Sequence, residues 1–235
     1  DPETNHMEVK GFGELVQCDH VILHREEHAG LDGERAGLFI MDTFTDVCDV
    51  VPTKGKTAEE AAVALRYFVG NREMKFMYSD NSKELMRTAE LLQVPHPTST
   101  PYRPENNGKV ERRIGVMAEG VRAALLQSGL PHRFWTLAAK HHLFASAITL
   151  NPRASDGMTA WERHHGEPFS GMRLPFGCLV FFRPKKPVMD SLAKFAPRTV
   201  PGIFMGWHTK PGYEFQGDYM VIALAAFRPT EADSA

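Results

Sequence analysis

The sequence predicts an α/β fold whose sheet mixes antiparallel and parallel strands. Three segments rich in β-forming residues follow one another near the start, and short polar joints separate them, as hairpins require. Helical and strand-like segments then alternate, which favours crossover connections and parallel pairing. The last third of the chain changes to short strand-like segments broken by Pro and Gly, which indicates a small, separate β-barrel.

Five strands are expected in the first part of the chain. The first segment alternates loosely between apolar and polar residues and carries Asp19. The last segment is interrupted by proline, which removes a backbone donor, so it is expected only at a sheet edge. In chain order the expected strands cover residues 14–23, 36–42, 46–52, 75–79 and 94–99.

Four helices are expected among these strands. Thr57 and Glu60 have the spacing of a capping box, which predicts the start of the first helix. The longest pattern has apolar residues three and four positions apart, which places them on one face of a helix. Pro131 suits the first turn of the last helix. The expected helices cover residues 57–69, 82–92, 105–127 and 131–150.

The same change in sequence pattern, to short strand-like segments broken by Pro and Gly, predicts the domain organisation. An α/β core is expected over residues 1–150, a connector over 151–173 and the β-barrel over 174–228. Residues 229–235 are polar and are expected to form a disordered tail. Trp135 and Trp161 are expected to be core anchors, the latter within the connector.

The composition, 43% hydrophobic and 24% charged, is ordinary for a water-soluble globular protein. The sequence has no run of 18 apolar residues, so no membrane span or membrane partner is expected. The polar first ten residues do not resemble a signal peptide. Cys18, Cys48 and Cys178 are too few and too scattered for a disulfide framework, which favours a reducing compartment.

Eleven histidines raise the question of a zinc site. His24 and His28 have helical i, i+4 spacing, but no third ligand is evident near them. The pairs 141–142 and 164–165 are interpreted as helix-surface and loop residues. The formal net charge is −2, yet basic residues outnumber acidic ones over 101–140 and 176–210. This distribution fits either ordinary surface charge or a metal site that faces a phosphate backbone.

Three carboxylates have contexts that predict a metal site: Asp19 in Gln-Cys-Asp-His, Asp80 in Tyr-Ser-Asp-Asn, and Glu111 one turn into the longest helix. A meander followed by a right-handed crossover places the fourth strand beside the first, in parallel, which brings Asp19 and Asp80 together. Converging carboxylates hold the divalent cations used in two-metal phosphoryl transfer. The alternative is that these residues are solvated or cap turns, and Asp80 could cap the helix after it. Asp42 is interpreted as a turn residue, with a fourth-carboxylate role as the alternative.

Read together, several blocks of the sequence resemble the integrase of a copia-type (Pseudoviridae) long-terminal-repeat retrotransposon. The most specific block runs from Pro101 to Glu111, as Pro-Tyr-Arg-Pro-Glu-Asn-Asn-Gly-Lys-Val-Glu. The blocks occur in the family's order and cover most of the chain. The others are Phe39–Phe44, Tyr78–Asn81, Gly129–Trp135, Phe176–Cys178 and Gly202–Gly206.

The resemblance implies a ribonuclease-H-like core with a D,D,E metal site, followed by an SH3-like β-barrel. Asp19, Asp80 and Glu111 fall on the three acidic positions, as catalytic residues and metal ligands. The family's activity is 3′-end processing and strand transfer of element DNA into target DNA, with Mg²⁺ or Mn²⁺. The resemblance also implies a homo-oligomer that assembles on DNA and acts in the nucleus after a cytoplasmic particle stage. The family's amino-terminal zinc module is not found in these residues.

Residues around the third carboxylate are expected to contact nucleic acid. Basic side chains could bind phosphate or only solvate the helix, and the Asn-Asn-Gly segment could form the loop or donate to DNA. The two lysines expected in the barrel could track DNA or lie in a solvated turn. The full set is Tyr102, Arg103, Asn106, Asn107, Gly108, Lys109, Arg112, Arg113, Lys185 and Lys186.

The chain departs from the family pattern in the stretch between Asp80 and Glu111, which is shorter than usual. Glu105 also replaces a usual Gln and adds negative charge near the expected DNA path. These departures leave a second function open, in which the chain is a catalytically inactive, domesticated or decayed integrase-like module that binds DNA or protein.

Overall fold

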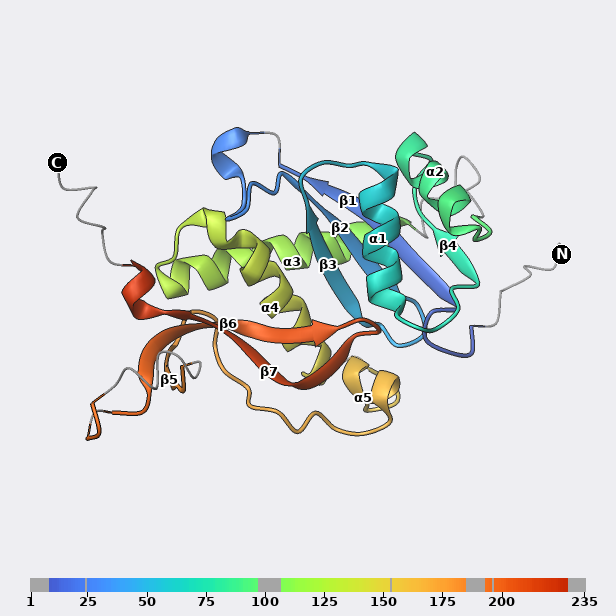
Figure 1. The fold of residues 1–235 in the computed structure, drawn as a ribbon. Helices are drawn as coiled ribbons and strands as arrows, with labels where there is room; N and C mark the ends of the chain where they lie inside the picture. Colours follow the sequence, from blue (N-terminus) through green and yellow to red (C-terminus); the bar gives the residue numbers. More distant parts are fainter. Residues whose placement is uncertain are drawn as a thin grey trace, which may run out of the picture.

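A four-stranded sheet forms the centre of the molecule (Figure 1), and it has the mixed strand directions that the sequence predicts. The computed structural model describes residues 9–23, 25–96, 107–152, 154–184, 193–195 and 197–227. The strand order is β3-β2-β1-β4, with β1, β2 and β3 antiparallel and β4 parallel to β1. The strands are β1 (Leu15–Ile22), β2 (Ala36–Asp42), β3 (Cys48–Thr53) and β4 (Phe76–Tyr78).

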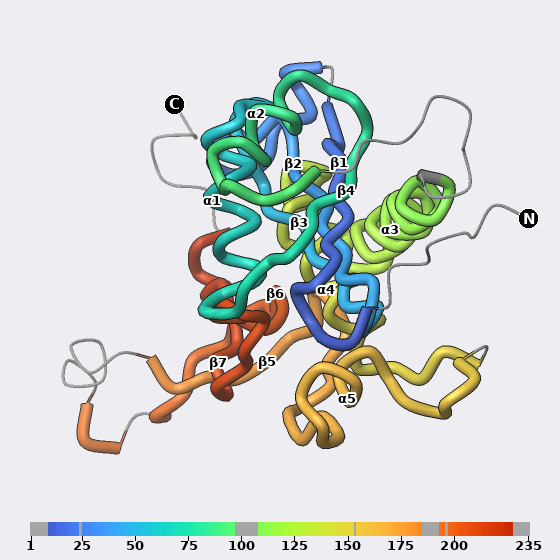
Figure 2. Tube along the Cα trace, turned by 90° about the vertical axis from the view of Figure 1, so that its right-hand side faces the viewer, coloured from blue at the N-terminus to red at the C-terminus, as the bar shows by residue number. Residues whose placement is uncertain are grey.

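Helices cover both faces of this sheet (Figure 2), which explains why every residue of β2 is buried. Side chains alternate along β2: Leu38 and Ile40 pack with α1 and α2, whereas Phe39 and Met41 pack with α3 and α4. The helices are α1 (Ala58–Val69), α2 (Lys83–Leu92), α3 (Asn107–Ser128) and α4 (Trp135–Ala147). In the described part of the chain, none of the helices is long and apolar enough to cross a membrane.

Side-chain caps define where two of these helices begin. The Thr57 hydroxyl accepts a hydrogen bond from the Glu60 backbone N–H at 3.2 Å, as the sequence predicts. The Glu60 carboxylate does not complete a reciprocal box, because it accepts instead from the Thr57 hydroxyl and the Lys54 N–H. Ser82 caps α2. A single 3₁₀ turn, His132–Phe134, follows Pro131 and leads into α4.

The predicted count of five strands is not confirmed, because four strands are present among the described residues. Of the expected fifth strand, 94–99, only residues 94–96 are described, and they are not in a strand. The Met77 N–H donates to the Pro95 carbonyl at 3.1 Å, so this segment does lie beside β4. Pro95 has no N–H to donate, which limits the ladder to isolated bonds.

The second half of the chain contains a three-stranded antiparallel sheet of order β5-β6-β7. The predicted SH3-like barrel is not confirmed in the described residues. Nor is the sheet separate, because Phe204 and Trp207 share one apolar cluster with Phe144 of α4 and with Trp161. The elements are α5 (Ala160–His165), β5 (Leu179–Phe182), β6 (Val200–Lys210) and β7 (Glu214–Ala223), with further 3₁₀ turns at Glu26–His28 and Leu224–Phe227.

The packing of this second sheet overturns the expectation that His141 lies on a helix surface. His141 is 9% exposed, its ring stacks on Trp207, and its Nε2 lies 3.0 Å from the Leu174 carbonyl oxygen. The reason is that α4 is covered by β3 and α3 as well as by β6, and so has no solvated face at this position. Trp135 and Trp161 are buried core anchors, as expected.

Candidate functional site

Asp19 lies on β1, and Asp80 follows the end of the neighbouring parallel strand β4 by two residues. In the β1–β4 ladder Leu15 pairs with Phe76 and Gln17 with Tyr78. Continuing this register by two residues places Asp80 beside Asp19, at a strand separation of about 4.8 Å. Side chains alternate along β1, so Asp19 faces away from the α1 and α2 side and toward the side covered by α3.

Helix α3 brings Glu111 to the same region. Val110, which is buried, lines a small cavity of about 10 Å³ together with Asp19 and Asp80. Burial raises the pKa of Asp19, and the negative charges of Asp80 and Glu111 raise it further, while a hydrogen bond from the His20 N–H opposes them. The three carboxylates are therefore near enough to act on one another electrostatically.

The donor set fits a hard divalent cation. All three side chains offer carboxylate oxygens, which Mg²⁺ and Mn²⁺ accept. Within the described residues, no Lys or Arg lies within ion-pair distance of Asp19, Asp80 or Glu111. The three carboxylates do not form a group whose oxygens all lie within 4.8 Å of one another, as far as the described residues go.

Asp80 also has a local structural contact. Its Oδ1 accepts a hydrogen bond from the Ser82 N–H at 3.1 Å, in the turn that leads into α2. The cap of α2 is nevertheless Ser82 itself, whose hydroxyl accepts from the Leu85 N–H. Asp80 therefore shapes the turn without being the helix cap, and a turn contact through one oxygen leaves the other available.

Asp42 is the last residue of β2, and its side chain stabilises the turn that follows, in line with the turn role that the sequence favours. It is fully buried, and its two carboxylate oxygens accept hydrogen bonds from the Gly13 N–H and from the Thr45 N–H and hydroxyl at 2.7–2.9 Å. Burial raises its pKa, and these hydrogen bonds lower it. Its two oxygens are thus occupied by Gly13, which precedes β1, and by Thr45 of the β2–β3 turn, which argues against Asp42 as a fourth member of the carboxylate cluster.

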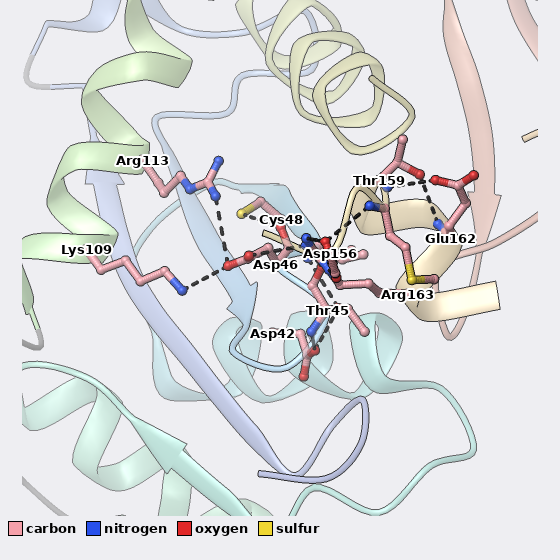
Figure 3. Close-up of polar contacts among 12 residues, drawn as sticks. Asp42, Thr45, Asp46, Cys48, Lys109, Arg113, Asp156, Thr159, Glu162 and Arg163 are labelled. Atoms are coloured by element: carbon pink, nitrogen blue, oxygen red, sulfur yellow. Dashed lines mark hydrogen bonds and ion pairs between the residues drawn. The ribbon is translucent and has the colours of Figure 1, made fainter. Parts of the chain in front are cut away.

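A cationic cluster surrounds Asp46, in the same β2–β3 turn (Figure 3). Its carboxylate lies 2.8 Å from Lys109 Nζ, 3.9 Å from Arg113 and 3.4 Å from Arg163. Lys109 and Arg113 are one helical turn apart on α3, on either side of Glu111 in sequence. Two of the residues predicted to bind phosphate are therefore paired with a carboxylate in this structure. The sequence analysis did not single out Asp46, because no local pattern marks a residue whose partners are 63 and 117 positions away.

The other residues predicted to contact nucleic acid have different surroundings. Arg112 is exposed on α3, and Gly108 lies in its first turn with open space beside it. Asn107 begins α3. The remaining members fall outside the residues that the structure describes, namely Tyr102, Arg103, Asn106, Lys185 and Lys186.

Comparisons with known proteins give relatives of one kind. The chain is 26% identical over 163 residues to the Retrovirus-related Pol polyprotein from transposon RE2 of Arabidopsis thaliana, covering 64% of this chain and 11% of that protein. It is 28% identical over 150 residues to the Pol polyprotein of Radiation murine leukemia virus (strain Kaplan), covering 61% and 25%. The chain thus spans a quarter or less of these relatives. No family model matches.

Two solved structures resemble this one at low sequence identity. The HTLV-2 integrase catalytic core domain, solved in complex with magnesium in a trimeric form, has a TM-score of 0.47 and 21% identity, covering 65% of this chain and 97% of that one. The catalytic core domain of BIV integrase has a TM-score of 0.45 and 17% identity, covering 64% and 92%. The sequence relatives confirm the resemblance to retroelement Pol polyproteins, and they include both retrotransposons and retroviruses.

Proposed function

We propose that this chain is the catalytic region of a retroelement integrase, with a ribonuclease-H-like core that acts on DNA through Asp19, Asp80 and Glu111. The observation that supports the proposal most directly is that Asp19 and Asp80 line one small cavity next to the β1–β4 ladder, together with Val110 of α3. The similarity to retrotransposon and retroviral Pol polyproteins supports it independently.

The three carboxylates would hold Mg²⁺ or Mn²⁺. Such ions, when bound, lower the pKa of an attacking water or DNA 3′-hydroxyl and neutralise charge on the leaving oxygen. Asp19 and Asp80 come from neighbouring strands of a rigid sheet, so their separation is set by backbone pairing. Glu111 comes from a helix, and its position depends on how α3 packs on β1. The proposed reaction is 3′-end processing and strand transfer, which needs no covalent protein intermediate.

DNA would approach along the amino-terminal part of α3. Arg112 is exposed there, and Lys109 and Arg113 could exchange Asp46 for a phosphate group. The proposed partners are the element ends and target DNA, with a homo-oligomer assembled on them in the nucleus. A net charge of −2 makes this local cluster, rather than the whole molecule, the source of attraction.

Two observations favour a second function. The three carboxylates do not converge to within 4.8 Å in the described structure, and the segment between Asp80 and Glu111 is shorter than in the family it resembles. Both features fit an inactive integrase-like module that binds DNA or protein without cutting it.

Nicking of a labelled DNA duplex in Mg²⁺ or Mn²⁺ distinguishes the two functions. Asp80→Asn keeps the shape and the oxygen that accepts from Ser82, but removes the charge. We expect this variant and Glu111→Gln to lose at least about 100-fold in rate while folding and binding DNA normally. Glu119→Gln, an exposed position on the same helix, serves as the matched control.

Each result of this nicking assay supports or contradicts one specific assignment. Cleavage by Asp80→Asn at a rate near that of the parent would show that the assigned residues are wrong. A parent protein that binds DNA but cuts in neither metal would support the inactive module. Equal losses in Glu111→Gln and Glu119→Gln would remove Glu111 from the proposed set.

A further inference from the structure

The hairpin between β6 and β7 is docked closely against the end of α1. The Gly212 N–H donates to the Tyr67 carbonyl at 2.9 Å, and the Tyr67 hydroxyl donates to the Thr209 carbonyl. The backbone of Gly212 also fills the space beside Gly70, where an added Cβ would lie 2.6 Å from the Gly212 nitrogen. This docking holds the first residue of β7, Glu214, near helix α5.

Two histidines of α5 meet Glu214 at this junction. One ring nitrogen each from His164 and His165 and one carboxylate oxygen of Glu214 lie within 4.8 Å of one another. Among the described residues this is the one group of three such side chains gathered so closely. The sequence predicts that the two histidines are loop residues, whereas both lie on a helix and are partly buried. Glu214 is far from them in sequence, so no motif spacing marks the set.

His164 is oriented as a metal-binding histidine is. Its Nε2 lies 2.9 Å from the Gly212 carbonyl oxygen, so Nε2 carries the proton and donates it. Nδ1 is then left with a free lone pair, and this atom is buried without a hydrogen-bond partner among the described residues. Metal-ligating histidines commonly donate the second N–H to a backbone carbonyl in this way.

Nδ1 of His165 faces Glu214 at a distance somewhat longer than the one that separates two ligands of one zinc ion. Nδ1 of His165 lies 3.8 Å from Oε2 of Glu214, which is too long for a hydrogen bond. Two ligands of a tetrahedral zinc ion lie about 3.3 Å apart when each bond is about 2.0–2.1 Å. The His165 ring stacks on Trp161 with centroids 3.7 Å apart, which fixes its plane.

Protonation and charge at the site are compatible with a cation. Burial lowers the pKa of His164 to about 4, and burial also lowers the pKa of His165, with Glu214 and the Tyr213 carbonyl acting the other way. Arg72 is the competing cation, because one of its nitrogens lies 3.6 Å from Oε1 of Glu214. It contacts the oxygen other than the one that faces His165, so both contacts can exist together.

We propose that His164, His165 and Glu214 bind Zn²⁺ or a similar transition-metal ion, with water as the fourth ligand. Two imidazoles and one carboxylate suit zinc rather than magnesium, which prefers oxygen ligands alone. The bound ion would connect the β6–β7 hairpin to α5, and so hold the second sheet on the core. The site is independent of the carboxylate cluster on β1, β4 and α3.

The test uses the full 235-residue chain carrying Asp80→Asn, so that metal binding at the proposed catalytic carboxylates is suppressed. After chelation and dialysis, Zn²⁺ is titrated by calorimetry, and Co²⁺ is added separately to record its visible absorption. His164→Gln and Glu214→Gln are compared with His208→Gln, which removes an exposed histidine of β6 outside the set. Hydrogen exchange of the β6–β7 amides is followed with and without Zn²⁺.

We expect one saturable Zn²⁺ per chain, a four-coordinate Co²⁺ spectrum, and slower exchange in the hairpin when zinc is present. His164→Gln and Glu214→Gln should weaken binding at least about tenfold, and His208→Gln should leave it unchanged. Glu214 is nearly half exposed, so its variant should fold even if the histidine variant does not. Absence of saturable Zn²⁺ binding, or equal binding by Glu214→Gln and His208→Gln, would overturn the proposal.

Discussion

The carboxylate of Asp46 lies 2.8 Å from the Nζ of Lys109, and this ion pair joins the β2–β3 turn to the first turn of α3. Arg113 and Arg163 approach the same carboxylate (Figure 3), so one residue connects a sheet turn with α3 and α5. Glu111 is carried by the helix that this cluster holds. The position of the third proposed catalytic carboxylate therefore depends on a residue with no role in the chemistry.

Two substitutions of Asp46 should distinguish the stability that its charge contributes from the cost of its left-handed backbone conformation. Asp46 has φ of +62°, which Asn adopts more readily than Ala. Asp46→Asn should lower the free energy of unfolding by about 0.5–1 kcal/mol, since partly exposed ion pairs contribute little each. Asp46→Ala should cost about 1 kcal/mol more because of the left-handed conformation. Urea denaturation measures the unfolding free energy of both variants. Identical losses in the two variants would show that the left-handed conformation does not affect stability at this position.

Charge reversal on α3 should change how DNA binding depends on salt. Arg112 is exposed, so Arg112→Glu should remove one phosphate contact and lower the slope of log K against log salt by about 0.9. Lys109→Ala should have a smaller effect, because Lys109 must first leave Asp46. Fluorescence anisotropy across a salt series gives the slopes. A slope for Arg112→Glu equal to that of the parent would make Arg112 a solvating residue only.

The buried His141 should make stability depend on pH. Burial lowers its pKa below the ordinary value of 6.5, while the Leu174 carbonyl opposes the shift and His142 adds to it. The unfolded chain therefore binds the proton first, so this contribution is present above pH 6.5 and is lost as pH falls through the interval below it. In His141→Gln the decline in unfolding free energy should be shallower by up to about 1.4 kcal/mol per pH unit.

Urea denaturation at intervals between pH 7.5 and 5 checks this expectation, with His208→Gln as the exposed control. Some dependence should remain in His141→Gln, because burial also lowers the pKa of His142 and His164. If His141→Gln and His208→Gln follow the same curve, His141 does not contribute to the pH dependence.

Gly70→Ala should loosen the docking of the β6–β7 hairpin. Gly70 has φ of +66°, and an added Cβ would meet the Gly212 backbone at 2.6 Å. We expect a loss of about 2 kcal/mol or more, combining backbone strain with displacement of the hairpin. Gly33→Ala is the control for strain alone, since Gly33 has φ of +81° and no atom within 4 Å of the added Cβ. Equal losses in the two variants would show that the contact with Gly212 is unimportant.

The pairing of the first strand with the fourth could be predicted from the sequence. A three-strand meander, a helix and a further strand leave few topologies, and right-handed crossover favours the one observed. Asp19 lies in the first predicted strand and Asp80 follows the fourth, so a topology that pairs these two strands predicts that the two carboxylates are close. The helix caps at Thr57 and Ser82 depend on residues three apart, and such local rules are visible in the chain.

The sequence alone determined the order of the first four strands and four helices and the mixed character of the sheet, and it predicted that two carboxylates are neighbours, because these features depend on local periodicity and on a chirality rule. Only the tertiary structure decided that the second sheet shares its core with α4, that His141 is buried, and that Asp46 and Glu214 meet partners remote in the chain. Side-chain packing between distant segments decides which surfaces of the core and of the second sheet face each other. No residue spacing within either segment predicts that arrangement.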